Sequence, residues 1–238
     1  MPKHEERLAR WAKEGKSGGE PVDASTVMLV RDAADGLETL MLRKNSKIAF
    51  GGMWVFPGGR VDEADRAGLA ADDDLGAARR AATREAEEES ALIIALDELV
   101  PFSHWTPPPV TPRRFLTWFF LAGAPTGEVV VDQGEILDHV WISPAEALAQ
   151  RDAGEIELAP PTFVSLFDLA QWPTVDAALA AVRARTPERF STRIAIHDDG
   201  PIALWHGDAG YAEGDASAPG ARHRLSMAPD GWRYERSG

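Results

Sequence analysis

Apolar residues gather in several short runs that are typical of β-strands. Two of these runs, residues 25–31 (STVMLVR) and 37–43 (LETLMLR), flank the turn-forming segment DAADG and together predict a β-hairpin. The other predicted strands in the first two thirds of the chain are rich in aliphatic and aromatic residues. They are residues 53–56, 114–122 (RFLTWFFLA, expected to be buried) and 128–132.

Helices are predicted where strong helix formers recur without glycine or proline. The clearest helix contains Ala77, Ala78, Ala81, Ala82 and Ala86 and ends near Leu92. The sequence SPAEAL predicts a second helix that begins after residue 143, with a serine N-cap, a proline at the first helical position and a glutamate completing a capping box. Further helices are predicted at residues 5–14, 162–170 and 175–185.

The pattern changes to alternating, strand-like runs after Phe190. Residues 191–197 and 201–205 predict one pair of strands, and residues 223–227 and 232–235 predict a hairpin around PDG. This part of the chain is therefore expected to form a small β extension without catalytic groups. Its exposed strand edges could pair with a second copy of the chain, so a homodimer is possible.

Composition narrows the class of protein. The chain has 238 residues, of which 44% are hydrophobic, enough for one substantial domain with elaborations. The expected division is an N-terminal arm at 1–20, a main domain at 21–189 and the β extension at 190–238. There is no run of eighteen apolar residues, no secretion-type N-terminal segment and no cysteine, so a cytoplasmic protein without a membrane partner is expected.

A net charge of −13 argues against binding to nucleic-acid polymers, which requires a basic surface. It does not argue against a small anionic substrate, because a bound metal ion and a few arginines can reverse the local field.

Three acidic residues of the predicted alanine-rich helix share one face. At about 100° per residue, Glu85, Glu88 and Glu89 lie together and repel one another, and a divalent cation would remove that repulsion. Glu87 points about 160° away from Glu85. A solvated acidic face is the simpler alternative. The nearby Asp72-Asp73-Asp74 run is expected to be an exposed loop in which Asp74 or a neighbour caps the helix.

These residues resemble the Nudix box, whose pattern is G-x5-E-x7-R-E-U-x-E-E-x-G-U, with U a bulky aliphatic residue. The matching positions are Gly59, Arg84-Glu85, Glu88-Glu89 and Leu92. There are four departures, namely Asp65 in place of the first glutamate, eleven extra residues between it and Arg84, Ala86 in place of an aliphatic residue and Ala91 in place of the last glycine.

The resemblance implies an α/β/α fold, with a mixed sheet between helices, and hydrolysis of a nucleoside diphosphate linked to another group. It also implies Mg²⁺ or Mn²⁺ held by Glu85, Glu88 and Glu89, with the backbone carbonyl of Gly59 as a further ligand. Arg84 is expected to orient a glutamate. Residues 135–142 resemble the family strand before an SPAEAL-type helix, and an acidic residue at its start often reaches the metal or the attacking water. The general base therefore stays open between Glu89 and Glu135.

The stretch MLRKNSKIAFGGMWVFPGG resembles, with imperfect spacing, the signature that coenzyme A diphosphatases carry before the box. Coenzyme A or an acyl-coenzyme A is therefore the expected substrate, with Arg43, Arg113 and Arg114 as candidates to bind its phosphates and a groove around residues 105–109 to accept its long arm. Two alternatives are an ADP-ribose or dinucleotide diphosphatase and a non-catalytic Nudix-fold binding module. Such modules usually lose box glutamates, which favours an enzyme here.

Overall fold

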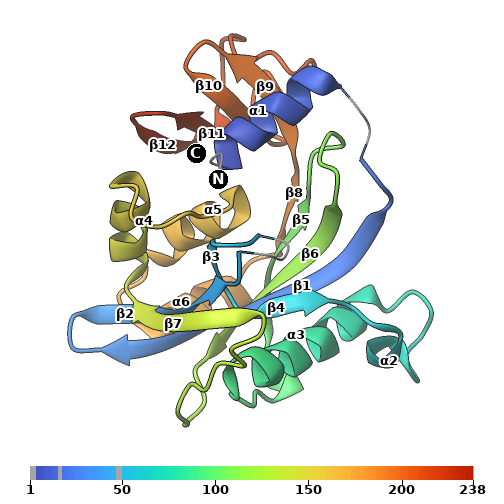
Figure 1. Cartoon of the computed structure of the whole chain (residues 1–238), viewed down its shortest axis with the longest axis vertical. Helices are drawn as coiled ribbons and strands as arrows, with labels where there is room; N and C mark the ends of the chain where they lie inside the picture. Colours follow the sequence, from blue (N-terminus) through green and yellow to red (C-terminus); the bar gives the residue numbers. More distant parts are fainter. Residues whose placement is uncertain (1–3, 16–17, 47–49, 238) are drawn as a thin grey trace. The chain divides into compact units, whose positions relative to one another are not determined.

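The computed structural model describes residues 4–15, 18–46 and 50–237 (Figure 1). The chain forms two compact units. The larger unit comprises residues 22–104 and 116–188, and the smaller unit comprises residues 1–21, 105–115 and 189–238. The division into an arm at 1–20, a domain at 21–189 and an extension at 190–238 stays a prediction.

The main sheet has eight strands. Six of them lie in the order β3-β2-β1-β6-β5-β8, while β4 pairs with β1 and β7 pairs with β2. Their bounds are β1 Pro21–Ala33, β2 Gly36–Lys44, β3 Trp54–Val55, β4 Gly58–Arg60, β5 Val100–Thr106, β6 Arg114–Gly123, β7 Ile136–Ile142 and β8 Glu188–Ser191. The hairpin expected from the first two apolar runs is confirmed, because β1 and β2 pair antiparallel from Val30↔Thr39 to Ala33↔Gly36.

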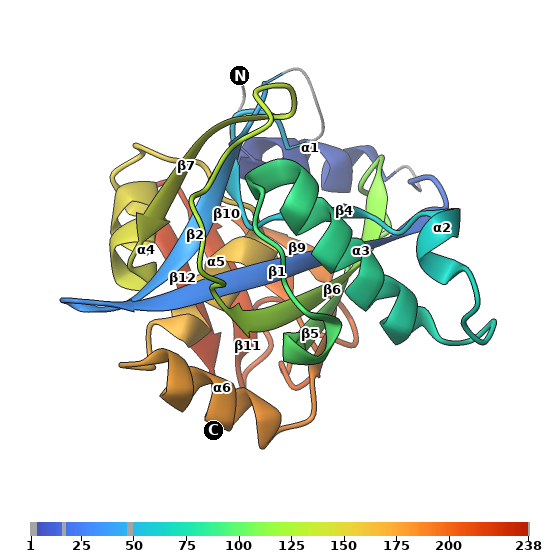
Figure 2. The ribbon, with the colours of Figure 1, turned by 90° about the horizontal axis from the view of Figure 1, so that it is seen from below.

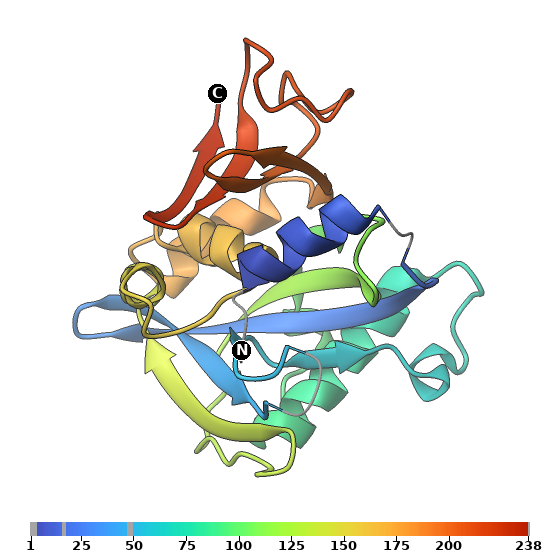
Figure 3. The ribbon, with the colours of Figure 1, turned by 45° about the horizontal axis from the view of Figure 1, so that its top comes forward.

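Helices cover both faces of this sheet in the larger unit, as Figures 1 and 3 show. Helix α3 (Asp74–Ser90) lies on one face, and helices α4 (Pro144–Asp152) and α5 (Pro160–Leu169) lie on the other. The remaining elements are α2 (Glu63–Arg66), the 3₁₀ helix η1 (Leu96–Glu98) and α6 (Val175–Arg183). The predicted α/β fold with a mixed sheet is thus confirmed.

Helix α3 packs through the alanines that predicted it. Ala78, Ala82 and Ala86 join a core cluster with Val27 and Leu29 of β1 and with Leu40 and Leu42 of β2. Small side chains on this face let the helix approach the sheet closely, and α3 also contacts β4 (Figure 2). Close packing of α3 positions its C-terminal turns, which also carry the glutamates, against the glycine-rich strand β4.

The helix termini follow the predicted capping chemistry with one exception. Asp73, the predicted neighbour of Asp74, caps α3 by accepting a hydrogen bond from the Gly76 N–H at 2.8 Å. Ser143 caps α4 by accepting from the Glu146 N–H at 3.2 Å. The other half of the predicted capping box is not formed, because the Glu146 carboxylate accepts a hydrogen bond from Gln150 one turn further on.

The prediction of a strand at residues 128–132 is wrong. Residues 128–132 have no strand structure, and the Val130 N–H donates to the Ser90 carbonyl at the end of α3. Val129 and Val131 pack against the core cluster while Val130 is 60% exposed. The alternation that suggested a strand therefore arises from an extended segment packing against the helix end, without a partner strand.

The smaller unit contains helix α1 (His4–Glu14) and an antiparallel sheet in the order β12-β11-β10-β9. The strands are β9 Arg193–His197, β10 Gly200–Leu204, β11 His223–Ala228 and β12 Gly231–Arg236, which confirms the predicted C-terminal β structure. Trp105 and Phe190 stack with ring centroids 3.9 Å apart, and both rings contact Trp205 edge-on. The unit is thus assembled from distant parts of the chain around an aromatic cluster.

A buried ion pair lies in the same unit. Arg224 of β11 and Asp208 form two hydrogen bonds, of 2.7 and 2.6 Å, and both residues are at least nine-tenths buried. The Asp208 carboxylate also accepts from the backbone N–H groups of Gly210 and His223. Because all of these hydrogen bonds are made inside the unit, the loop that follows β10 is fixed to β11.

Within the described part of the chain, every helix is too short or too polar to cross a lipid bilayer.

Candidate active site

Two consecutive glycines bring a strand against the acidic face of α3. Strand β4 pairs with β1 in the register Ser25↔Gly59 and Thr26↔Gly58. A side chain at Gly58 would overlap the backbone of Ser25 and Thr26, and a side chain at Gly59 would overlap the carboxylate of Glu85. Glycine is therefore required at Gly58, where the β1 backbone lies too close for a side chain, whereas at Gly59 the missing side chain leaves room for the Glu85 carboxylate.

Arg84 lies at the centre of a network of acidic side chains. Its guanidinium donates to Glu85 Oε1 at 2.8 Å and to Glu88 Oε2 at 3.1 Å through one nitrogen. The other two nitrogens donate to the carboxylate of Asp65 at 3.3 and 3.0 Å, and one also reaches the carbonyl of Arg60. All five donor directions of an arginine fork are thus directed at oxygen atoms of α3 and of the segment before it.

Asp65, which stands in place of the first glutamate of the box, takes part in this network. It is 95% buried, and besides Arg84 it accepts a hydrogen bond from the Asp62 backbone N–H at 2.9 Å. The shorter side chain at the place of the family glutamate therefore connects the turn before α2 to the middle of α3. The eleven extra residues lie between these two points and do not interrupt the contact.

Glu89 is buried beside a lysine. Lys44 Nζ donates to Glu89 Oε1 at 2.9 Å, and the Gly58 N–H donates to Glu89 Oε2, also at 2.9 Å. Only 12% of the Lys44 side chain and 5% of the Glu89 side chain are exposed. Burial raises the pKa of Glu89, although Lys44 and the Gly58 N–H act in the opposite direction.

Glu85 and Glu88 differ in their environment although they share Arg84. Glu85 is partly buried against Gly59, and burial raises its pKa while the hydrogen bond from Arg84 only partly offsets this effect. The Glu88 side chain is 59% exposed. Glu87 is also exposed, as the helix geometry predicted for a residue on another face.

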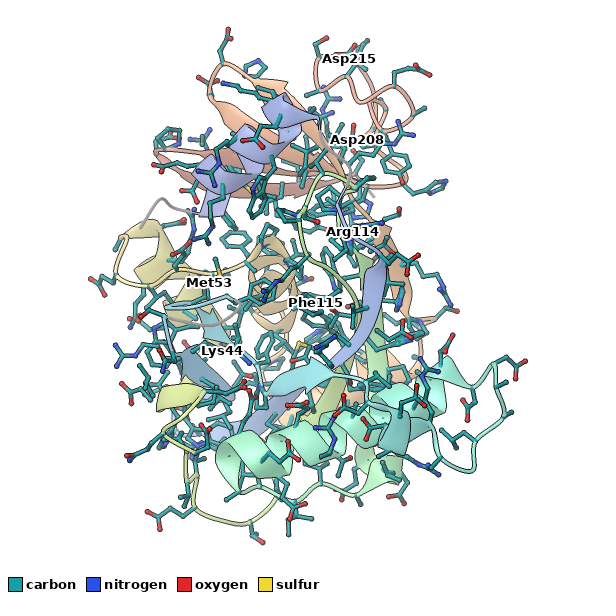
Figure 4. The ribbon with its side chains drawn as sticks, turned by 45° about the vertical axis from the view of Figure 1, so that its right-hand side comes forward. Lys44, Met53, Arg114, Phe115, Asp208 and Asp215 are labelled. Carbon is teal, nitrogen blue, oxygen red and sulfur yellow. The ribbon has the colours of Figure 1, made fainter. Side chains whose placement is uncertain are left out.

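Glu135 stands immediately before β7, and its side chain is 64% exposed. Its carboxylate lies 3.9 Å from Lys44 Nζ, so the two candidates for the general base, Glu89 and Glu135, flank the same ammonium group. The Glu135 backbone is held from both sides, because its N–H donates to Asp132 and its carbonyl accepts from the Asn45 N–H. Figure 4 labels Lys44 in this region.

The three arginines proposed to bind phosphate do not belong to one unit. Arg43, on β2, is exposed and forms an ion pair of 3.6 Å with Asp138 of β7. Arg113 and Arg114, at the start of β6, belong to the smaller unit. Arg113 is exposed, whereas Arg114 is partly buried.

The chemistry of the donor set fits a hard divalent cation, because Glu85, Glu88 and Glu89 supply carboxylate oxygens on one face of α3. Their arrangement is not that of a metal centre, since no three acidic or histidine side chains among the described residues converge as ligands. Basic side chains occupy the carboxylates: an Arg84 nitrogen lies between Glu85 and Glu88, and Lys44 Nζ contacts Glu89. Metal binding would require these side chains to rearrange.

Lys44 is the main site residue that lies outside the sequence predictions, because the second predicted strand ends at residue 43. The structure continues β2 through Lys44. Leu40, Leu42 and Lys44 alternate along this strand, and the two leucines face α3. A predicted strand that is one residue longer would place Lys44 on the same face as the two leucines, opposite the glutamates of α3.

Comparison with known proteins agrees with this geometry. The chain matches the NUDIX domain over residues 21–162. Among solved structures, it is similar to the NUDIX hydrolase from Alicyclobacillus acidocaldarius, with a TM-score of 0.61 and 24% identity over 68% of this chain and 96% of that one.

Two other solved structures share less of the fold. The NUDIX domain of Shewanella oneidensis NrtR, complexed with ADP ribose, has a TM-score of 0.46 and 18% identity over 71% of this chain and 97% of that one. A C. elegans Ap4A hydrolase has a TM-score of 0.42 and 22% identity over 67% and 98%. The NUDIX match spans more than half of the 238 residues and contains the glycine turn, the Arg84 network and Glu89, so this chain belongs to the NUDIX family.

Proposed function

We propose that this protein is a metal-dependent hydrolase that cleaves the diphosphate linkage of a nucleoside diphosphate derivative. The observation that supports the proposal is that Glu85, Glu88 and Glu89 lie beside the glycines of β4. Arg84 donates hydrogen bonds to Glu85 and Glu88, and the Gly58 N–H donates to Glu89. A solvated acidic helix face would need neither a buried glutamate nor a glycine that leaves room for a carboxylate. Water attack on a diphosphate requires both charge neutralisation and a positioned base, and this cluster offers groups for each.

In this proposal Glu85, Glu88, Glu89 and the Gly59 carbonyl hold Mg²⁺ or Mn²⁺, which when bound neutralises phosphate charge and lowers the pKa of a water molecule. Arg84 keeps the backbone of the site together through Asp65 and Arg60 when its bonds to Glu85 and Glu88 are released. The Gly58 N–H fixes one oxygen of Glu89. The backbone contacts of Arg84 and Gly58 thus support the carboxylates, and metal binding requires Arg84 and Lys44 to release them.

Glu89 and Glu135 are the two proposed proton acceptors. Burial raises the pKa of Glu89, which makes its carboxylate a stronger base than an ordinary exposed glutamate. Glu135 is more exposed and could reach a water molecule without displacing a ligand.

Gly59→Ala tests whether the close approach of Glu85 matters for metal binding. The new methyl group would displace the Glu85 carboxylate, which is expected to weaken Mn²⁺ binding about tenfold or more. The protein should stay folded, because the end of a flexible side chain can move. Gly123→Ala, whose methyl group would meet only ordinary van der Waals contact, is the control. Equal Mn²⁺ affinities in calorimetric titrations of the two variants would contradict the assignment of Glu85.

Coenzyme A or an acyl-coenzyme A is the proposed substrate. The support comes from the sequence between Arg43 and Gly59 and from the interrupted box. Arg43, Arg113 and Arg114 remain the proposed phosphate-binding residues, and the ion pair of Arg43 with Asp138 is exposed and 3.6 Å long, so an incoming phosphate could replace it at little cost. The 3′-phosphate of coenzyme A is the group that such an arginine would recognise.

Comparison of coenzyme A with dephospho-coenzyme A tests this substrate. Loss of the 3′-phosphate is expected to remove about 1–3 kcal/mol of transition-state binding, measured as a drop in kcat/KM. ADP-ribose and the dinucleotide NADH complete the panel. Preference for ADP-ribose or a dinucleotide would favour the alternative diphosphatase. Tight binding of any of these compounds without hydrolysis, in the presence of Mn²⁺, would indicate a non-catalytic module instead.

A further inference from the structure

Lys44 is a charged residue on a strand face that otherwise carries buried leucines. It is the last residue of β2, on the strand face that Leu40 and Leu42 turn toward α3, and the β2–β7 register shifts between Arg43 and Lys44. Its backbone is bonded to the segment before β3, because the Lys44 N–H donates to the Met53 carbonyl and the Lys44 carbonyl accepts from the Gly52 N–H. The root of the side chain is therefore fixed by its neighbours.

The ammonium group at the end of this side chain donates a hydrogen bond to the Glu89 oxygen that the Gly58 N–H does not contact. One Glu89 oxygen accepts the Gly58 N–H and the other accepts Lys44 Nζ, each at 2.9 Å. The charge of Lys44 also lowers the pKa of Glu85, to a smaller extent than burial raises it. Lys44 therefore supplies, from within the chain, positive charge at the place where an ion would otherwise neutralise these carboxylates.

A second carboxylate lies within reach of the same ammonium. Glu135 Oε2 is 3.9 Å from Lys44 Nζ and is far more exposed than Glu89. Both the Lys44 backbone and the residue before β7 are fixed, because the Asn45 N–H donates to the Glu135 carbonyl at 2.7 Å. Rotation of the flexible end of the lysine could thus transfer its ion pair from Glu89 to Glu135 without movement of the backbone.

We propose that Lys44 is a tethered cation that competes with the metal ion for Glu89. In the metal-free protein it neutralises Glu89, and when metal binds it moves to Glu135. The inference rests on the proposed metal site of the preceding section. It predicts that Lys44 weakens metal binding and that removing its charge strengthens it, the opposite of what a residue that merely supports the site would do.

The test is a calorimetric titration of Mn²⁺ into the full chain and its variants. Lys44→Gln is expected to tighten the Mn²⁺ Kd by about tenfold or more, because the metal no longer displaces a buried ammonium. Arg31→Gln removes the same charge from an exposed arginine of β1 paired with Glu38, so it is expected to leave the Kd within about twofold, since exposed charges are screened. An unchanged or weaker Kd in Lys44→Gln would overturn the proposal.

A double variant shows whether the gain passes through Glu89. In the Glu89→Gln background, Lys44→Gln should no longer tighten Mn²⁺ binding, since the contested carboxylate is absent. A full tenfold gain in that background would mean that Lys44 acts only through the general field, which would also overturn the proposal. If neither wild type nor Lys44→Gln binds Mn²⁺, the proposed function fails together with this inference. If the wild type binds Mn²⁺ and Lys44→Gln binds it with the same Kd as the wild type, only this inference fails.

A measurement on the wild-type chain covers the case in which Lys44→Gln does not fold. The εCH₂ signal of Lys44, assigned with Lys44→Arg, should shift in carbon-detected lysine NMR when Mg²⁺ saturates the protein, because the ammonium changes its partner. Signals of lysines far from the glutamates provide the reference. A Lys44 signal that stays in place while Mg²⁺ binding is evident from calorimetry would overturn the proposal.

Discussion

Replacing Glu88 with glutamine is expected to lower kcat for the preferred diphosphate substrate by about 100-fold or more while the protein stays folded. Loss of groups that only orient metal ligands already costs about 10–100-fold in metal affinity or activity, so loss of a ligand should cost at least as much. The fold should tolerate the change, because the Glu88 side chain is 59% exposed and its ion pair with Arg84 contributes at most about 1 kcal/mol.

Glu87→Gln is the matched control for this experiment. Glu87 precedes Glu88 on the same helix and is also exposed, and the variant removes the same charge with the same change of side chain. Its kcat and Mn²⁺ affinity should equal those of the wild type. Steady-state kinetics and Mn²⁺ titration on both variants would decide the matter. A similar kcat in Glu87→Gln and Glu88→Gln would remove Glu88 from the proposed metal site.

The second large effect is expected in the smaller unit. Asp208→Asn should destabilise this unit by about 3 kcal/mol or more, because it leaves the buried guanidinium of Arg224 without its charge partner. The loop after β10 would lose its attachment to β11, so opening of the four-stranded sheet should become easier. Hydrogen exchange of backbone amides in residues 200–236 measures the opening free energy of this unit directly.

Asp215→Asn is the control, because Asp215 lies in the same loop but is exposed and its side chain accepts hydrogen bonds from the nearby Ser217 (Figure 4). Its opening free energy should stay within about 0.5 kcal/mol of the wild-type value. Equal protection of β10 and β11 in the two variants would show that the buried ion pair contributes nothing to the sheet.

The same ion pair predicts how the unit responds to acid. Burial would raise the pKa of Asp208, but hydrogen bonds from Arg224 and from two backbone N–H groups outweigh it and lower the pKa to about 2. Because the folded pKa lies below that of the unfolded chain, the stabilisation is complete above about pH 4 and is lost as the pH falls towards 2. This loss amounts to about 2 kcal/mol. It should be absent from the opening free energy of Asp208→Asn.

Much of the fold could be predicted because local patterns and tertiary packing agree. The hairpin of β1 and β2, the alanine face of α3 and the C-terminal strands each combine a clear period with a clear turn or cap. The false strand at residues 128–132 shows the limit. Alternation reports only that every second side chain is covered, and Val129 and Val131 are partly buried against the core cluster without a neighbouring strand.

The candidate site could be located from the sequence, but its charge arrangement could not. The spacing of Glu85, Glu88 and Glu89 placed them on one face of a helix. The resemblance to the Nudix box implied that Arg84 orients a glutamate, but no pattern in the sequence shows that Lys44 forms an ion pair with Glu89, because that contact depends on side-chain conformation. The ion pair between Asp65 and Arg84 could not be predicted for another reason. The number of residues between the two differs from that in the family pattern.

The long connection between Asp65 and Arg84 has a consequence for how relatives of this chain can be recognised. The connection 66–83 has eighteen residues, eleven more than the family pattern, and forms the end of α2, an exposed loop and the first turns of α3, while the residues on either side of it are joined by one ion pair. Lengthening an exposed loop costs little free energy, since the closure entropy grows only with the logarithm of its length. A search pattern that counts residues between the acid and the arginine therefore rejects chains whose ancestors gained a loop here, whereas a search for the spatial pair would retain them.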